Sequence, residues 1–328
     1  MKQITSLLGL TIALMISATA ALALEPVNFA TDWKAQAEQG GFYQAKALGL
    51  YEKAGLDVTI RSGGPGVNIP QLLGAGAIEF GMGSNSFIPF NMVRAGVPAT
   101  AVMAAFQKDP QVLITHPRDD IQTLADMKGQ PIMVADATVN AFWAWLRVKY
   151  GFENRQIRKY TFNLAPFLVD PKAIQQGYVT SEPYTIETKG GVAPKVFLLA
   201  DYDYPSYASM VLAHNDWIEN KPDLVQAFVD ASMEGWRSYV FGDPSPGNQL
   251  IQQANPDMTD DIIANAIRQM RSRNMVRSDD TKTLGIGAMT AQRWQSFFET
   301  MSQSGVYEKD LDWQSAFTTR FINKGEVR

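Results

Sequence analysis

The stretch VNFATDWKAQAEQGGFYQAKALGLYEKAGLDVTI, residues 27–60, establishes the fold class. Residues 27–30 are mostly apolar, which predicts a short strand. Apolar side chains recur at every third position from Phe42 to Tyr51 and so share one face of a predicted helix. Gly55 is typical of the residue that ends a helix, and residues 56–60 alternate as a half-buried strand does. The order of strand, polar loop, helix and strand indicates an α/β sheet.

The polar loop at residues 32–41 lies where an open α/β sheet binds its ligands. Such ligands sit beyond the carboxyl ends of strands and beside helix N-termini. Trp33 stands in this loop between Asp32 and Lys34, and not on an apolar face. We therefore expect this loop to contribute to a ligand site.

The alternation of strand and helix continues along the rest of the chain. A second α/β unit begins near Pro117, and residues 207–213 are typical of a strand that returns to the first unit. Beyond residue 222 the pattern is mainly helical. The 46% hydrophobic content and the length of 328 residues predict a globular chain of two domains.

The N-terminal segment is typical of a cleavable signal peptide at residues 1–23. Lys2 precedes an apolar run at residues 7–21, and Ala21-Leu22-Ala23 matches a cleavage site with small residues. A membrane anchor is the alternative, but the run is short for a bilayer span and no charged cluster follows it. We expect export, with no integral membrane segment after signal removal.

The composition excludes several classes of function. The chain has no cysteine, which excludes disulfides, thiolate catalysis, cysteine metal sites and a lipidated cysteine tether. An exported chain without a tether is expected in the periplasm of a Gram-negative bacterium. The net charge is -4 and the basic residues form no long run, so nucleic acid is not an expected partner.

An ordered set of short motifs along the mature chain resembles one family. The set comprises residues 41–45 with Gly49-Leu50-Tyr51, Gly55-Leu56-Asp57-Val58, Gly74-Ala75-Gly76, residues 78–81 with Ser84, residues 94–98, and Leu124-Ala125-Asp126-Met127-Lys128-Gly129. In this order they resemble the periplasmic solute-binding proteins of ABC importers. The branch is the one related to thiamine-pyrimidine, sulfonate and nitrate binding proteins, that is, NMT1/THI5-like and SsuA-like.

The resemblance implies a periplasmic binding protein type II fold, in which two α/β lobes joined by two crossover strands close on a ligand. It places the crossovers near residues 111–116 and 207–213. Lobe 1 would comprise residues 24–115 and 208–328, and lobe 2 residues 116–207. The implied partners are a small solute, an inner-membrane ABC permease and its ATPase, with no cofactor and no metal.

The opening Asp32-Trp33 and the Gly-Phe-Tyr helix resemble most closely the proteins that bind pyrimidine precursors of thiamine. Flavins, other heteroaromatics and sulfonates are alternative solutes, and a periplasmic sensor is an alternative role. Fungal pyrimidine synthases resemble the same opening. Their active lysine and histidine would fall on Gly83 and Phe87, and their cysteine-rich motif is absent, so the synthase interpretation fails.

Candidate ligand residues follow from the polar loops at helix N-termini. An indole can stack on a planar ring, and amides, hydroxyls and glycine-exposed backbone can orient it. Packing or helix capping is the alternative for each residue. The first-lobe candidates are Trp33, Gln39, Gly40, Ser62, Ser84, Asn85, Ser86 and Gln107.

The second-lobe candidates occupy the analogous loops. Glu182 is the leading one, because a carboxylate accepts two N–H bonds from an aminopyrimidine edge, whereas a helix N-terminal acid is its alternative role. The others are Thr138, Asn140, Trp143, Asn163 and Tyr184, with Tyr207 closing the pocket from the side.

No catalytic set is predicted. His116 and His214 are the only histidines, they are far apart, and no HExxH-type motif is present. The paired acids, such as Asp119-Asp120, are typical of loops and caps. The sequence therefore predicts a binding protein and not an enzyme.

Overall fold

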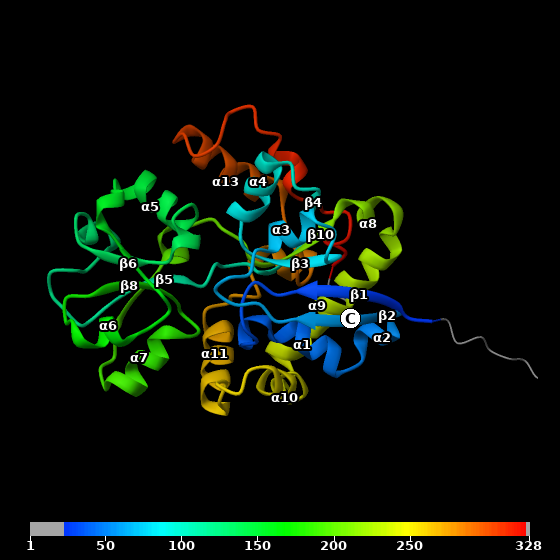
Figure 1. Ribbon diagram of the computed structural model, residues 1–328, viewed down its shortest axis with the longest axis horizontal. Helices are drawn as coiled ribbons and strands as arrows, with labels where there is room; N and C mark the ends of the chain where they lie inside the picture. Colours follow the sequence, from blue (N-terminus) through cyan, green and yellow to red (C-terminus); the bar gives the residue numbers. More distant parts are fainter. Residues whose placement is uncertain (1–22, 326–328) are drawn as a thin grey trace, which may run out of the picture.

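The computed structural model describes residues 23–325, which form two α/β lobes (Figure 1). The first sheet has the strand order β2-β1-β3-β10-β4, and the second has the order β7-β6-β8-β5-β9. The first sheet comprises β1 (Glu25–Ala30), β2 (Leu56–Arg61), β3 (Phe80–Asn85), β4 (Ala99–Phe106) and β10 (Ala208–His214). The second comprises β5 (Gln111–Thr115), β6 (Ile132–Val134), β7 (Ile157–Lys159), β8 (Ile174–Tyr178) and β9 (Lys195–Leu198).

Most helices belong to the first lobe. They are α1 (Gly40–Ala47), α2 (Leu50–Lys53), α3 (Ile69–Gly74), α4 (Phe87–Ala95), α8 (Asn215–Asn220), α9 (Pro222–Phe241), α10 (Ser245–Ala254), α11 (Asp260–Ser272), α12 (Asp279–Leu284) and α13 (Ala291–Gln303). The second lobe carries α5 (Phe142–Tyr150), α6 (Ala165–Val169) and α7 (Glu182–Gly190).

The opening stretch forms the predicted strands, but its helix is divided. β1 and β2 pair in parallel, with Val27 opposite Val58. The predicted helix separates into α1 and α2 because Gly49 adopts a φ of 64°, a left-handed conformation that interrupts the helix. Gly55 has a φ of 83° and ends α2, as its position predicts.

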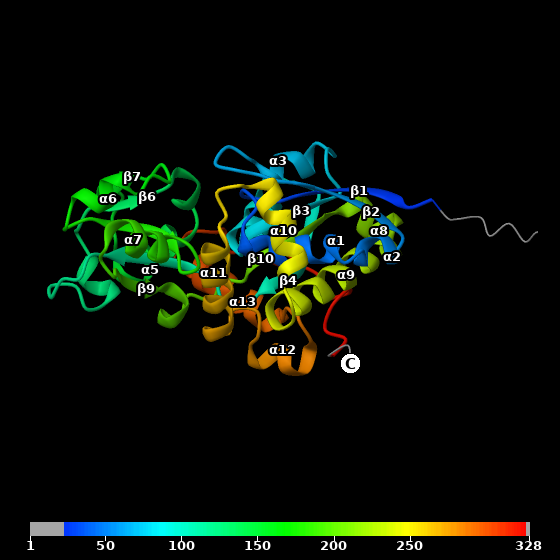
Figure 2. The same cartoon turned by 90° about the horizontal axis from the view of Figure 1, so that it is seen from below.

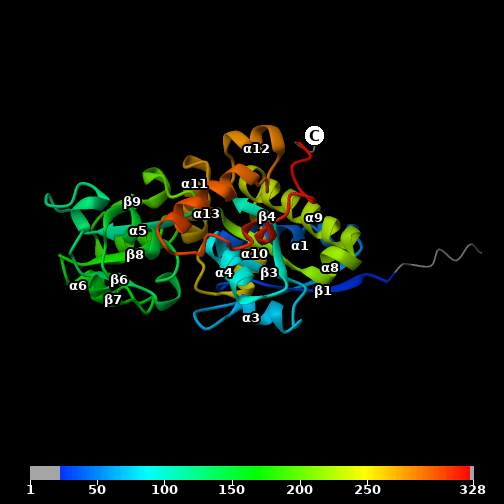
Figure 3. The same ribbon diagram turned by 90° about the horizontal axis from the view of Figure 1, so that it is seen from above.

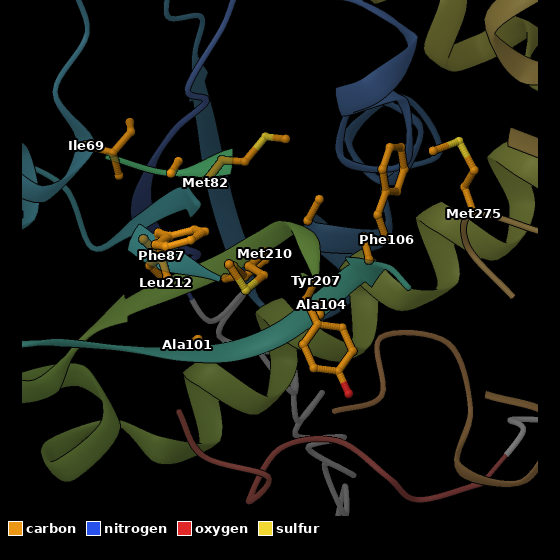
Figure 4. Close-up of a cluster of buried hydrophobic side chains, with 14 of the residues drawn as sticks. Ile69, Met82, Phe87, Ala101, Ala104, Phe106, Tyr207, Met210, Leu212 and Met275 are labelled. Carbon is orange, nitrogen blue, oxygen red and sulfur yellow. The ribbon is translucent and has the colours of Figure 1, made fainter. Parts of the chain in front are cut away.

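The helix α1 lies unusually close to α9, and this contact fixes its N-terminus at the edge of the sheet. A Cβ on Gly41 would lie 2.2 Å from the Trp236 ring, so only glycine permits this approach. The apolar core continues around β4 and β10, where Figure 4 shows Phe87, Met210 and Leu212 side by side. Each such side chain contributes about 1.5–3 kcal/mol on burial.

Two chain crossings connect the lobes. β5 pairs with β8 and β9, so it belongs to the second sheet and not to the first lobe as predicted. The first crossing is therefore residues 107–110, a few residues earlier than predicted. The crossing ends at residue 110 because β5 begins to pair with β8 at Gln111. β10 begins at Ala208 in the first sheet, so the second crossing is residues 204–207.

The second lobe, in green, extends away from the first in every view, and α11 lies at the junction (Figures 1, 2 and 3). α11 contacts α7 of the second lobe. Across residues 23–325, no helix combines the length and the apolar composition that a bilayer crossing requires. The predicted signal segment lies, apart from its last residue, outside the described residues.

Candidate functional site

A cleft of about 1060 Å³ separates the two lobes. Its first-lobe wall is formed by the loop after β1, the glycine-rich loop at residues 64–70 and the end of β3. Its second-lobe wall is formed by the segments that follow β6, β7 and β8. The cleft therefore lies beyond the carboxyl ends of parallel strands in both lobes, the place where such sheets bind ligands.

Several of the predicted site residues lie at this cleft. They are Trp33, Gln39, Ser84, Asn85, Thr138 and Glu182. Thr138 is held by a 2.7 Å hydrogen bond from its hydroxyl to Gln176 Oε1. The amide oxygen of Asn85 accepts from the Phe87 backbone N–H at 3.1 Å. These two side chains are oriented before any ligand arrives.

Three first-lobe candidates do not line the cleft, because their side chains or backbone make contacts within the protein instead. Gly40 packs on α9, where a Cβ would lie 2.0 Å from the Tyr239 ring. Ser62 accepts the Ala35 backbone N–H at 3.0 Å and so fixes the loop that carries Trp33. Ser86 is buried and accepts the Tyr207 N–H at 2.9 Å, which ties α4 to the second crossing.

Gln107 and Tyr207 also lie outside the cleft lining, in the hinge region. The Gln107 amide donates to the carbonyls of Ala104 and Ala288 at 3.0 and 2.9 Å. The Tyr207 hydroxyl accepts the Thr290 N–H at 3.0 Å. Both side chains are buried, and their polar atoms are used within the first lobe.

Four second-lobe candidates likewise do not line the cleft. Trp143 is fully buried and donates to Asn154 Oδ1 at 3.1 Å. Asn163 caps the turn before α6 by accepting the Ala165 N–H at 2.9 Å. Asn140 is exposed, and Tyr184 lies on α7 but does not line the cleft.

Trp33 meets an aromatic ring of the opposite lobe. The ring centroids of Trp33 and Phe162 lie 4.5 Å apart at an interplanar angle of 51°. Phe162 follows β7 and adopts a φ of 60°, which is rare for a residue with a side chain. Such strain is often held where a surrounding structure needs one side-chain direction. Both rings line the cleft, one from each lobe.

Sequence reasoning missed three carboxylates at the cleft, Asp32, Glu38 and Asp109. Asp32 accepts a hydrogen bond from the Ser84 hydroxyl, while its Oδ1 is buried without a partner. Burial raises the pKa of Asp32 to about 6, against the effect of hydrogen bonds from Ser84 and Gln39. The position of Asp32 beside Trp33, directly after a strand, was the available signal.

Glu38 and Asp109 are almost fully buried, at 4% and 2% exposure. Burial raises the pKa of Glu38, and the charge of Asp32 adds to the effect. Burial also raises the pKa of Asp109 to about 7, against the N–H of Gln111 at 2.9 Å. No local pattern distinguished these acids from surface acids.

Glu182, at the start of α7, completes the set from the second lobe. Its Oε2 accepts the Tyr178 N–H at 2.8 Å, and the Tyr160 hydroxyl donates to Oε1 at 3.4 Å. Burial raises the pKa of Glu182 to about 7, and the charge of Glu38 contributes to the rise. Glu38 and Glu182 thus interact across the cleft.

The lobes are joined by direct contacts as well as by the crossings. The Thr180 hydroxyl of the second lobe donates to Glu38 Oε1, and the Asn265 amide donates to the Thr180 carbonyl at 3.5 Å. The Arg293 guanidinium donates to Gln107 O at 2.7 Å and to Ser206 O at 2.9 Å. Arg293 therefore binds both crossings at once.

Neither histidine lies at the cleft. His116 contacts the Phe167 carbonyl at 2.7 Å and stacks on its ring, and His214 accepts the Asp216 N–H at 3.2 Å. Within residues 23–325, no group of three or more His, Cys, Asp or Glu side chains is arranged to hold a metal ion. The arrangement is suited to holding a polar aromatic molecule by stacking and hydrogen bonds.

Comparison with known proteins identifies relatives of this chain. The riboflavin-binding protein RibY of Chloroflexus aurantiacus is 25% identical over 236 residues, 70% of this chain. The chain spans 66% of the length of that relative.

The solved structures give the fold. The periplasmic aliphatic sulphonate binding protein SsuA of Escherichia coli matches with a TM-score of 0.68 and 16% identity, covering 90% of this chain and 92% of that one. The desulfurization enzyme DszB matches with a TM-score of 0.54 and 11% identity, covering 90% and 97%. Residues 36–245, more than half of the sequence, match the family described as NMT1/THI5 like. The chain therefore belongs to the NMT1/THI5-like family and has the periplasmic binding protein fold.

Proposed function

We propose that this chain is the periplasmic solute-binding component of an ABC importer and that it captures a planar heteroaromatic solute between its lobes. The observation that carries the proposal is the cleft itself, which is lined by aromatic side chains of both lobes, among them Trp33 and Phe162. Its volume of about 1060 Å³ lies just above the range of about 300–1,000 Å³ for small-molecule sites.

Capture depends on closure of the lobes. The two crossings, residues 107–110 and 204–207, are the only chain connections between the sheets within residues 23–325. A solute shifts the protein to the closed form only if it binds that form more tightly. Contacts with Trp33 from one lobe and Glu182 from the other provide that difference, because both are complete only when the lobes are close.

A pyrimidine precursor of thiamine is our first candidate for the solute. The carboxylates of Glu182 and Asp32 can accept hydrogen bonds from the N–H groups of its aminopyrimidine edge. Its ring can stack beside Trp33. Riboflavin is the second candidate. The similarity to RibY supports riboflavin, and the cleft volume leaves room for a solute of more than one ring.

Delivery rather than turnover is our proposal, although an enzyme shares the fold. The cleft brings together carboxylates and aromatic rings, while His116 and His214 are used elsewhere and cysteine is absent from the sequence. The closed lobes would present a joint surface to an inner-membrane permease and its ATPase. A sensor that docks on a membrane receptor would use the same closure.

Small-angle scattering of the purified protein tests the proposal. Native mass spectrometry first identifies any small molecule that the protein retains. We expect the radius of gyration to fall when the thiamine pyrimidine precursor or riboflavin is added at saturation. An unchanged scattering curve with both, together with no heat of binding, would contradict the proposal, and a turnover product would favour an enzyme.

A further inference from the structure

The described residues that line the cleft carry a strong excess of acid. The acids are Asp32, Glu38, Asp109, Asp136, Glu182 and Asp257, against two bases, Lys34 and Lys159. Four of them, Asp32, Glu38, Asp109 and Glu182, are buried or half-buried, whereas Asp136 and Asp257 are exposed. Tyr178 lies among these four: burial raises its pKa, and the charges of Asp109, Asp32, Glu38 and Glu182 raise it further.

The bases do not neutralise this interior. Lys34 is exposed, and Lys159 is exposed and paired with Asp136 at 2.9 Å. Arg293 affects Asp109 from behind, but it donates to backbone carbonyls of the crossings and does not line the cleft. A buried carboxylate without a positive partner either takes up a proton or binds a cation, so above the pKa values of these acids a cationic ligand is favoured.

From this arrangement, and resting on the proposed function, we infer that the solute is an organic cation: a protonated nitrogen base on a planar ring that donates N–H bonds to Asp32 and Glu182. An amidinium, an aminopyrimidinium and a primary ammonium substituent belong to this class. A sulfonate or another organic anion does not.

Two buried polar atoms at the cleft have no hydrogen-bond partner, which favours a ligand that carries N–H donors. Asp32 Oδ1 is buried without a hydrogen-bond partner, and so is the hydroxyl of Tyr204. Tyr204 is 3% exposed and lines the cleft. A buried polar atom without a partner costs free energy, so a ligand that supplies N–H donors here gains affinity. Quaternary ammonium compounds lack the required donors.

The walls of the cleft also favour an organic cation over a metal ion. The cleft is lined by the aromatic side chains of Trp33, Phe142, Tyr160, Phe162, Tyr178 and Tyr204. Aromatic faces attract cations, and the attraction increases when water is excluded. Within residues 23–325 the acids do not converge as metal ligands. Rings and carboxylates together recognise a flat, charged nitrogen compound.

Three probes of equal ring size and different charge test the inference: benzamidinium, benzamide and benzenesulfonate. Isothermal titration calorimetry at pH 8 is expected to give an affinity for benzamidinium at least tenfold higher than for benzamide, and no binding of benzenesulfonate. Equal or tighter binding of benzamide or benzenesulfonate would overturn the inference, as would no binding of all three.

Variants assign the effect to the carboxylates. Asp32→Asn and Glu182→Gln should each weaken benzamidinium binding at least tenfold and weaken benzamide binding by a smaller factor, because only benzamidinium loses a charge interaction as well as an acceptor. Asp119→Asn, an exposed acid outside the cleft, is the matched control and should change neither. Circular dichroism confirms that each variant is folded, and two cleft variants are used so that one that fails to fold does not decide the result. Unchanged benzamidinium affinity in a folded cleft variant would overturn the inference.

The pH dependence gives an independent readout. Benzamidinium keeps its positive charge between pH 5 and pH 8. Asp32 and Glu182 become protonated towards pH 5 and so lose their negative charges. The affinity for benzamidinium should therefore rise more than tenfold over this interval, with protons released into the buffer on binding. The groups that face these acids are Glu38, Tyr160, Tyr178, Ser84 and Gln39. A flat or falling affinity would contradict the inference.

The failure of this inference and the failure of the proposed function give different results. If riboflavin or another neutral solute closes the lobes in scattering while benzamidinium does not bind, only the charge inference fails. If no solute of any charge produces closure, the proposed function fails as well.

Discussion

At the scale of the residue, Trp33 carries the clearest prediction. Trp33→Ala should weaken solute binding by up to about tenfold, because a stacked ring contributes about 0.5–1.5 kcal/mol beyond burial. Its stability effect should be small, because Trp33 is half-buried and contacts Phe162 across the cleft. Calorimetry and urea unfolding measure the two effects. Phe241→Ala, an exposed aromatic residue outside the cleft, is the control, and an unchanged affinity in Trp33→Ala would remove Trp33 from the site.

The buried acids predict how the stability of the free protein depends on pH. Burial raises the pKa of Asp32 to about 6 and those of Asp109 and Glu182 to about 7. Because these pKa values lie above those of the unfolded chain, their contribution to stability is present below about pH 4 and is lost as the pH rises through 6 to 7. One shifted unit is about 1.4 kcal/mol.

We therefore expect the melting temperature of the ligand-free protein to be several degrees higher at pH 5 than at pH 8. Each kcal/mol lost from the free energy of unfolding lowers the melting temperature by about 2–4 °C. Differential scanning calorimetry measures the difference. Asp109→Asn should reduce the dependence, because the amide does not titrate. A melting temperature that rises from pH 5 to pH 8 would show that other groups dominate.

At the scale of the element, the two crossings depend on one side chain from α13. Arg293 donates to Gln107 of the first crossing and to Pro205 and Ser206 of the second, and its guanidinium lies 3.9 Å from the centre of the Tyr207 ring. Lysine has a single ammonium and cannot make this forked set of bonds.

Arg293→Lys should therefore lower the free energy of unfolding by about 2–3 kcal/mol, because hydrogen bonds from a charged group are lost. Chemical denaturation measures this loss. Arg320→Lys, which alters one exposed bond to Ile218 O, is the control and should change stability by less than about 0.5 kcal/mol. Equal stability of wild type and Arg293→Lys would mean that the crossings hold their geometry without it.

The elements were largely predictable, and the site only in part. Local spacing was sufficient for β1 and β2, and the loop after β1 was correctly expected beside the cleft, because strand ends and helix starts are local features. The sequence alone does not distinguish Tyr207 and Gln107 from ligand-binding residues. Their hydrogen bonds are made with Thr290 and Ala288, which lie far along the chain. Asp109 was missed for the same reason.

At the scale of the whole molecule, closure depends on contacts between the lobes. The Thr180 hydroxyl of the second lobe donates to the buried carboxylate of Glu38 in the first. Thr180→Val replaces the hydroxyl by a methyl group of similar volume, so the Glu38 carboxylate loses this hydrogen bond. We expect the variant to be more open without solute, with a larger radius of gyration in small-angle scattering and about tenfold weaker solute binding.

Thr188→Val, which removes an exposed hydroxyl that donates to the Tyr184 carbonyl within α7 and does not line the cleft, is the matched control and should leave both quantities unchanged. If Thr180→Val gives the same scattering curve and affinity as the wild type, the Glu38 contact does not govern the distance between the lobes.

The ring contact between Trp33 and Phe162 also makes Trp33 an intrinsic fluorescent reporter of the distance between the lobes. Trp143, Trp145, Trp236 and Trp294 are at most 2% exposed, so the polarity around their indoles changes little when the lobes move. Trp217 and Trp313 are half-buried in the first lobe and do not line the cleft. Trp33 is half-buried at the seam, and separation of the lobes would bring water to its ring. A red shift of the tryptophan emission would therefore indicate separation of the lobes in real time, without any attached dye.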